Sequence, residues 1–339
     1  MSESAKRSLK RYTRIVGAGF AMGVANVIPG VSGGTMAFIL GIFEELIQSI
    51  QAFACAETFK KLLKFQFKEL YRTLPWKFLL ALFIGVGIAF ATASSLFVYL
   101  LEHHQSITYA FFFGLILASI FAMFKEVSKW TVGVWIGIVI GTALSAYLVS
   151  LVPATTPNNW YLSLGSGIVA ICAMILPGIS GSFLLLLFGQ YNYVWGAVSR
   201  LTTLQASWND ISTLFWTALG AVIGLGAFVH LLNYMLAKFR NATMATLIGF
   251  MIGSLWRLWP WQETTIWAYK TESGKVYVES EAVMQGLRAA GHELEQVKVT
   301  NVLPQEFNGE FFATAGILLF GIVLVLVIEY IAKKHSSEA

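Results

Sequence analysis

Hydrophobic residues in this chain occur in long runs that are separated by short polar stretches. Six runs are long enough to cross the hydrocarbon core of a bilayer, which takes about 20 residues of helix. We expect these spans at residues 76–101, 107–124, 131–152, 212–237, 243–259 and 311–332. The pattern predicts an all-α polytopic membrane protein.

Two further apolar stretches, residues 15–50 and 161–199, are each interrupted by a Pro-Gly pair. The pieces on either side are about 15 residues long, too short to span the bilayer alone, and proline ends a helix. We therefore expect each stretch to form a re-entrant helical hairpin that returns to the side from which it entered. The predicted structural breaks are Pro29, Gly30, Pro177 and Gly178.

Two polar segments fall outside the predicted spans. In residues 58–74, apolar positions recur at helical spacing while lysine and arginine occupy another face, which is typical of an interfacial helix on an anionic leaflet. Residues 261–310 contain strand-like and helix-like patterns around turn residues. Because structureless loops longer than about 15 residues are uncommon, we expect an ordered extracytoplasmic insertion there.

Composition and charge support this topology. The chain is 57% hydrophobic and 12% charged, whereas soluble domains carry about 25% charged residues. With two non-crossing hairpins, the segments assigned to the cytoplasm hold 17 of the 23 lysine and arginine residues, as the positive-inside rule requires. Both termini are expected in the cytoplasm, and the protein in a bacterial cytoplasmic (inner) membrane.

One short motif occurs twice. Residues 29–33 read Pro-Gly-Val-Ser-Gly, the first motif, and residues 177–181 read Pro-Gly-Ile-Ser-Gly, the second motif. A hairpin plus three spans crosses the membrane an odd number of times, so the second half starts on the opposite side. We expect an inverted repeat of residues 1–155 and 156–339. The alternative is that small residues recur simply because membrane helices pack through them.

The repeated break could bind an anion. A helix that restarts inside the membrane presents free N–H groups and a positive dipole end, and serine adds hydroxyl donors. The alternative is that Pro-Gly only makes a tight turn in a packed bundle. The residues that we expect to bind a phosphate are Ser32, Gly33, Gly34, Thr35, Ser180, Gly181 and Ser182.

Charged residues near the spans are further candidates because charge is costly in lipid. Arg257 could attract a phosphate, or it could be an interfacial arginine that snorkels to the surface. His230 lies in the middle of a span and could carry a coupled proton, or bond to a neighbouring helix. Glu44 and Glu45 could bind a coupling cation, or form the solvated end of the first hairpin.

The two motifs carry a resemblance to a known family. Residues 17–35 (GAGFAMGVANVIPGVSGGT) and 174–183 (MILPGISGSF) resemble the two signatures of the bacterial polyprenyl-phosphate transporter family. The resemblance implies a lipid transporter that returns undecaprenyl phosphate from the outer to the cytoplasmic leaflet for carrier-lipid recycling. The two copies differ in the residues that follow them. Ser182-Phe183 follows the second motif, whereas Gly34-Thr35 follows the first, so the two motifs need not be equivalent.

Two other functions compete with this hypothesis. A secondary transporter of a small anion or polar solute would use the same broken-helix architecture. An enzyme acting on prenyl phosphates would need an Arg/His constellation or Asp-rich magnesium motifs, which the sequence lacks. We expect no enzyme, no cofactor and no nucleic-acid partner. The expected partners are a polyprenyl phosphate and membrane lipids, with proton or sodium coupling.

Overall fold

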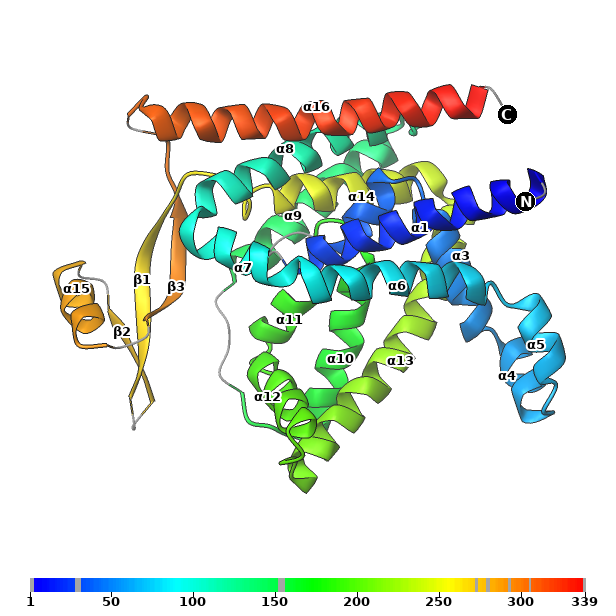
Figure 1. Ribbon diagram of the computed structural model, residues 1–339, viewed down its shortest axis with the longest axis horizontal. Coiled ribbons are helices and arrows are strands. Elements are labelled where there is room, and N and C mark those ends of the chain that lie inside the picture. The colour runs from blue at the N-terminus through cyan, green and yellow to red at the C-terminus, as the bar shows by residue number, and fades with distance from the viewer. Residues whose placement is uncertain are drawn as a thin grey trace.

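The computed structural model of the chain describes residues 3–27, 32–151, 156–271, 274–278, 281–291, 294–304 and 306–337. Pro29 and Gly30 of the first motif lie outside the described residues. The fold is mainly helical (Figure 1). Its helices are α1 (Glu3–Val27), α2 (Gly33–Ile39), α3 (Phe43–Ala54), α4 (Ala56–Leu63), α5 (Phe67–Thr73), α6 (Trp76–Thr92), α7 (Ser94–His103), α8 (Gln105–Phe124), α9 (Val132–Ser150), α10 (Trp160–Ile175), α11 (Gly181–Leu187), α12 (Tyr191–Thr202), α13 (Trp208–Lys238), α14 (Arg240–Ser254), α15 (Glu281–Ala289) and α16 (Gly309–Ser337).

Helices long and apolar enough to cross a membrane confirm a polytopic helical protein. Among the described residues these are α8, α9, α13 and the part of α16 from Gly309 to Tyr330, and the bent pair α5 and α6 could supply a fifth. Two of the six predicted spans are not single long helices. The run 76–101 is divided at Ala93 into α6 and α7, and α14 ends at Ser254, within the run 243–259.

The end of α14 has a local cause. After Ser254 the backbone bonds tighten from i→i−4 to i→i−3, so that the N–H of Arg257 donates to the carbonyl of Ser254 at 3.0 Å. Pro260 then follows, and it has no N–H to continue a helix. The turn places Arg257 beyond the end of α14 rather than on its side.

Each predicted hairpin consists of three helices rather than two. In the first, α1 begins at Glu3 instead of near residue 15, because the helix continues through the basic N-terminal segment. After the Pro-Gly break, a seven-residue helix follows, and then a turn with a left-handed glycine: Gly41 (φ 68°) before α3 and Gly189 (φ 67°) before α12.

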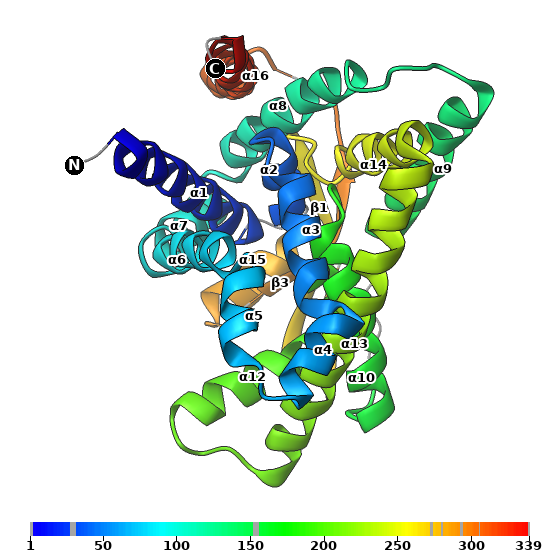
Figure 2. The same cartoon turned by 90° about the vertical axis from the view of Figure 1, so that its right-hand side faces the viewer.

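Helix pairs surround the short helices α2 and α3 (Figure 2). In the first half α1 packs against α6, and in the second half α10 packs against α13. The other two pairs join the halves, because α8 packs against α16 and α9 against α14. The third long helix of each half thus packs on the fourth long helix of the other half.

Glycines make the same close approaches in both halves. A Cβ atom at Gly19 would lie 2.1 Å from the carbonyl oxygen of Leu82, and one at Gly167 would lie 2.3 Å from that of Thr217. Gly167 follows Gly19 by 148 positions, and Thr217 follows Leu82 by 135. Only glycine permits such backbone contact between helices.

The other helix pairs repeat the pattern with the same offset. A Cβ atom at Gly141 would approach the carbonyl oxygen of Thr246 to 2.4 Å, and one at Gly321 would approach that of Phe111 to 2.5 Å. Thr246 again follows Phe111 by 135 positions. The three-dimensional contacts therefore align α6 with α13 and α8 with α14 at an offset of 135 residues.

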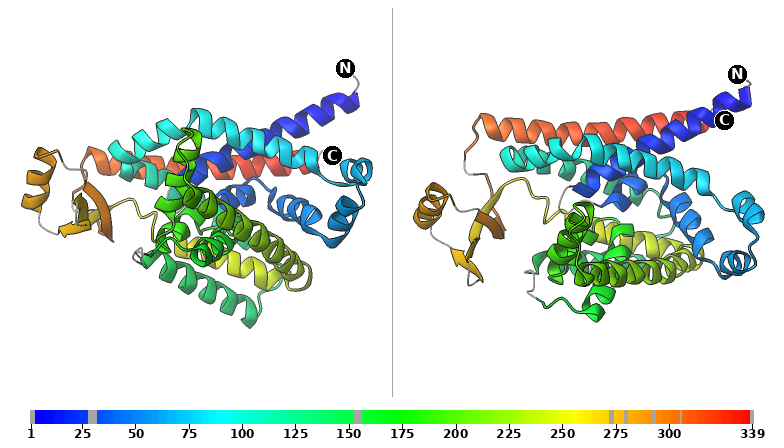
Figure 3. Two further views of the ribbon diagram at one scale, coloured as in Figure 1. Left: turned by 90° about the horizontal axis from the view of Figure 1, so that it is seen from below. Right: turned by 60° about the horizontal axis from the view of Figure 1, so that its bottom comes forward.

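Two small substructures lie at opposite ends of the molecule (Figure 3). At one end the insertion 261–310 forms a sheet of β1 (Gln262–Thr271), β2 (Gly274–Val278) and β3 (Leu294–Asn301), with α15 beside it. The strand order is β2-β1-β3 and both pairings are antiparallel. This confirms an ordered insertion, although the sequence did not indicate β3.

The predicted interfacial helix, the start of α1 and the end of α16 lie at the opposite end (Figures 1 and 3). The segment 58–74 is two helices, α4 and α5, rather than one. The chain turns between them at Phe65, whose φ of 54° is uncommon for a residue with a side chain. Its aromatic ring is exposed.

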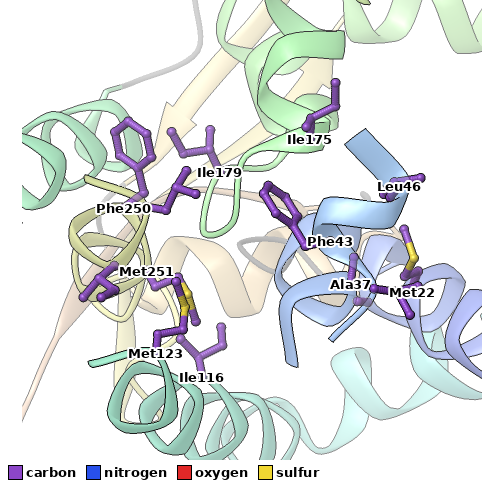
Figure 4. Packing of buried hydrophobic residues seen from close by; sticks show 14 of the residues in the cluster. Met22, Ala37, Phe43, Leu46, Ile116, Met123, Ile175, Ile179, Phe250 and Met251 are labelled. Atoms are coloured by element: carbon purple, nitrogen blue, oxygen red, sulfur yellow. The ribbon is translucent and has the colours of Figure 1, made fainter. Parts of the chain in front are cut away.

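A continuous hydrophobic core connects the two motifs to the long helices (Figure 4). Ile179 of the second motif lies beside Phe250 of α14, while Ile175 at the end of α10 lies on the side of α3. A Cβ atom at Gly178 would come within 2.5 Å of the Phe250 carbonyl oxygen, and the φ angle of Gly178 is 83°. Glycine is thus required there both by conformation and by space.

Candidate functional site

The two motifs are in direct contact. The Ser32 hydroxyl donates to the carbonyl oxygen of Met174 at 3.2 Å, and the N–H of Gly178 donates to the Thr35 hydroxyl at 2.9 Å. A Cβ atom on Gly34 would lie 2.2 Å from the Ile175 carbonyl oxygen. The motifs from the two halves of the chain therefore form one packed unit at the centre of the molecule.

The first motif uses its donors within the protein. Ser32 caps α2, since its side chain accepts from the N–H of Gly34 at 3.1 Å and its carbonyl from the N–H of Thr35 at 3.0 Å. The N–H of Gly33 donates to the side-chain oxygen of Asn26 at 2.9 Å. Ser32 and Thr35 are fully buried. The N–H groups that begin α2 therefore all have acceptors within the protein.

The second motif makes fewer hydrogen bonds within the protein. Ser180 caps α11 through a long bond from the N–H of Phe183 (3.4 Å), and its hydroxyl lies 2.9 Å from that of Ser182. Among the described residues, the N–H groups of Gly181 and Ser182 donate to no hydrogen bond. This motif therefore retains both amide and hydroxyl donors.

A cavity of about 1440 Å³ lies beside the second motif. Ser180, Gly181 and Ser182 line it, and so do Gly33 and Gly34. Ser32 and Thr35 do not line it, in accord with their burial in the contact between the motifs. Apolar side chains of α3, α6, α10, α11 and α12 form most of the remaining wall.

Arg257 lines the same cavity from the turn after α14. Among the described residues, no carboxylate lies within 4 Å of its guanidinium group. The base of the insertion holds the turn, because Gln262 donates to the carbonyl of Arg257 and Asn301 to that of Trp256, each at 2.8 Å. The cavity thus combines a half-buried, unpaired cation with the donors of α11.

The remaining predicted residues lie away from the cavity. His230 is exposed on α13, and its Nδ1 lies 2.7 Å from the carbonyl oxygen of Gly226 in the same helix rather than a neighbouring one. Glu44 pairs with Arg240 at 2.7 Å, and Glu45 pairs with Arg11 at 2.6 Å. Among the described residues, no group of three or more His, Cys, Asp or Glu side chains could hold a metal ion.

Several polar residues of the cavity escaped the sequence argument. Asn26 stands in the first signature, where an amide side chain within an apolar run could have been singled out as costly in lipid. Asn192 of α12 gave no such signal. The insertion contributes Gln262, Thr300 and Asn301, which lie on a segment to which the sequence assigned no role.

These features define a polytopic helical membrane protein with a large, mainly apolar cavity whose polar groups are suited to an anion. Residues 22–276 match the undecaprenyl phosphate translocase-like family, and the chain belongs to that family.

Two curated relatives are similar over most of their length. One is the polyprenyl-phosphate transporter of Vibrio cholerae serotype O1, which is 40% identical over 76% of this chain and 81% of its own length. The other is the polyprenyl-phosphate transporter of Staphylococcus aureus, 31% identical over 73% of this chain and 86% of its own. No solved structure matches the chain.

Proposed function

We propose that this protein transports undecaprenyl phosphate, or a related polyprenyl phosphate, from the outer to the cytoplasmic leaflet, so that the carrier lipid can be reused in cell-envelope synthesis. The names of the two relatives support the substrate class, and the family supports transport rather than catalysis. The direction of transport follows from the need to recover a carrier released on the outer face.

The observation that carries this proposal is the joint presence of Arg257 and the α11 donors on one apolar cavity. Arginine presents a planar fork of donors that matches phosphate oxygens. The N–H groups of Gly181 and Ser182 and the Ser182 hydroxyl add neutral donors. In this proposal the phosphate lies between Arg257 and α11, while the prenyl chain lies along the apolar walls.

The cavity favours a lipid over a small anion. Its volume exceeds the roughly 300–1,000 Å³ that is typical of small-molecule pockets. Its wall includes large apolar side chains that are also open to the surroundings, such as Phe83 of α6 (65% exposed) and Trp195 of α12 (52%). A prenyl chain can leave through such a wall into the bilayer, whereas a small anion does not need an apolar wall that is open to the bilayer.

The repeated helix contacts support an inverted repeat with residues 1–155 and 156–339 as its halves. The basic segments support cytoplasmic termini, and the acidic insertion supports its exposure on the outer face. The proposal also places the protein in the bacterial cytoplasmic membrane.

Coupling to a proton or sodium gradient is part of the same proposal. The sequence offers His230, Glu44 and Glu45 as its candidate residues, but the His230 ring is engaged with its own helix, which argues against a role in coupling. The ion pairs of both glutamates favour a role in holding helices together over one in binding a free cation.

Reconstitution tests the function directly. The purified protein in liposomes is given a labelled undecaprenyl phosphate, and exposure of the label on each leaflet is followed under imposed proton and sodium gradients. We expect protein-dependent movement of the lipid, and no uptake of inorganic phosphate into the lumen. Uptake of inorganic phosphate without lipid movement would favour the small-anion transporter, and movement of neither would refute transport of this substrate class.

A further inference from the structure

The two halves differ in how their hairpins pack, although their long helices pair in the same way. Helix α3 of the first hairpin packs against α13 of the second half. Asn233 of α13 donates to Gln51 of α3. The Cβ atom of Ala54 lies 3.8 Å from the position that a Cβ atom on Gly226 would take. We call this contact the α3–α13 seam.

The repeat identifies the counterpart of this seam. The offset of 148 residues equates α3 with α12, and Ala54 with Thr202. The offset of 135 residues found in the glycine contacts equates α13 with α6, and Gly226 with Ala91. If the halves had the same arrangement, α12 would pack on α6 with Thr202 beside Ala91.

No such packing joins α12 and α6 among the described residues. Both helices line the cavity instead, α6 through residues such as Phe83 and Phe90 and α12 through Asn192 and Trp195. Ala91 is exposed on its helix. The cavity therefore occupies the place where the second half would form the counterpart of the α3–α13 seam.

The open side is the side of the insertion. Trp256, Gln262 and Thr300, at or next to the base of the sheet, line the cavity. The α3–α13 seam lies toward the other end, where Glu44 of α3 also pairs at 2.7 Å with Arg240, the first residue of α14. With the orientation proposed above, the cavity opens toward the outer face and the seam closes the cytoplasmic side.

We propose that the α3–α13 seam is the cytoplasmic gate of the transporter, and that α12 and α6 form the matching outer gate, which is open in this structure. Transport then exchanges the two arrangements: α12 closes on α6 while α3 separates from α13. This inference rests on the proposed function. It assigns Gln51, Asn233, Glu44 and Arg240 to a gate that must break and re-form in each cycle.

The polar contacts at and beside the seam suit a gate. The ion pair of Glu44 with Arg240 joins α3 to the start of α14; both side chains are nearly half exposed, and ion pairs of this kind contribute little stability. Ala54 and Gly226 meet through small surfaces. Ile47 of α3 and Val229 of α13 are buried in the core, so separation of the two helices requires the core to repack there.

Paired disulfides test the gate in the full-length protein, with Cys55→Ser and Cys172→Ala removing the native thiols. A Cβ separation of 3.8 Å matches that of protein disulfides, so Ala54→Cys with Gly226→Cys should cross-link rapidly in the resting protein. We expect the cross-link to lower lipid transport at least tenfold and a reductant to restore it. Each single-cysteine variant is the control and should transport normally.

The matched pair Ala91→Cys with Thr202→Cys reports the outer gate. We expect it to cross-link slowly at rest and faster when undecaprenyl phosphate is added, because closure of α12 on α6 brings the two positions together. Full transport by the oxidised Ala54→Cys/Gly226→Cys protein would overturn the proposal. So would an Ala91→Cys/Thr202→Cys pair that never cross-links, with or without the lipid.

Cross-linking is read by mass spectrometry and does not depend on transport. If the unlocked protein moves no polyprenyl phosphate, the proposed function fails. The gate is then judged on cross-linking alone: slow formation of the Ala91→Cys/Thr202→Cys bond in the resting protein supports two alternating states, and its absence refutes them.

Discussion

The two copies of the repeated motif have nearly the same sequence and different surroundings. In the first, Ser32 and Thr35 are buried and bonded to the second half, and the N–H groups that begin α2 all have acceptors. In the second, Gly181 and Ser182 line a large cavity, and among the described residues their N–H groups donate to no hydrogen bond. The first copy joins the two halves, whereas the second is the copy that we propose as the ligand site.

The difference originates in two positions. Where the first motif continues with Gly34 and Thr35, the second continues with Ser182 and Phe183. Glycine at position 34 allows backbone contact with Ile175, and a serine in the equivalent place adds a hydroxyl at the cavity. A duplicated helix break has thus acquired one structural and one ligand-facing copy.

The largest effect is expected when Gly34 is replaced by serine, the residue that stands at the equivalent position after the second motif. In Gly34→Ser the new Cβ atom would lie 2.2 Å from a backbone carbonyl, which must move. We expect a loss of about 3 kcal/mol of stability, the upper range for overpacking, seen as a lowered melting temperature in detergent and poor accumulation. A protein of unchanged melting temperature would contradict the close contact between the motifs.

Removal of the cavity's cation should have the next largest effect. A hydrogen bond to a charged group contributes about 1.5–3 kcal/mol, so Arg257→Gln should lower lipid transport by about 10- to 150-fold with unchanged melting temperature. Arg72→Gln, on the exposed face of α5, is the matched control and should transport normally. Equal transport by the Arg257→Gln and Arg72→Gln proteins would place the phosphate elsewhere.

The reverse exchange separates binding from stability. Ser182→Gly removes a hydroxyl of the cavity and should weaken lipid-phosphate binding about 2- to 10-fold, the range for a neutral hydrogen bond, without change in melting temperature. Thr35→Val removes the acceptor for Gly178 and should do the opposite, lowering stability by about 1–3 kcal/mol with binding unchanged. If both variants affected the same property, the two motifs would not have divided roles.

The smallest effect is expected at His230. Its ring lies outside the cavity and is engaged with its own helix. We expect His230→Gln to change transport less than twofold and to leave its dependence on the proton gradient intact. Loss of that dependence would make His230 the coupled residue.

Much of the architecture could be predicted from the sequence. Four of the six long apolar runs predicted helices that are long and apolar enough to span a membrane, α8, α9, α13 and α16. Local patterns could not show that the run 76–101 is divided at Ala93 or that Phe65 separates α4 from α5, because no proline or glycine marks a helix end at either place. The offset of 135 residues is visible in the sequence for α8 and α14, where Thr108 and Gly114 match Thr243 and Gly249. Its extension to α6 and α13 required the contacts of Gly19 and Gly167 in space.

Four of the residues predicted from the helix breaks and from an arginine near a span, Ser180, Gly181, Ser182 and Arg257, line one cavity. Their role in binding a phosphate stays a prediction. The sequence could not show which motif has free donors. That depends on Asn26 and on Gly178, whose bonds to the first motif arise only from the tertiary packing.

Photo-cross-linking with a polyprenyl phosphate that carries a photoreactive group next to its phosphate tests the division of roles most directly. The labelled protein is digested and the modified residues are identified by mass spectrometry. We predict labels on residues 180–183 of the second motif and on residues 256–262 around Arg257, and a large decrease when unlabelled undecaprenyl phosphate competes. Competable labelling confined to residues 32–36, or to α4 and α5, would contradict the assignment of the phosphate to the second motif.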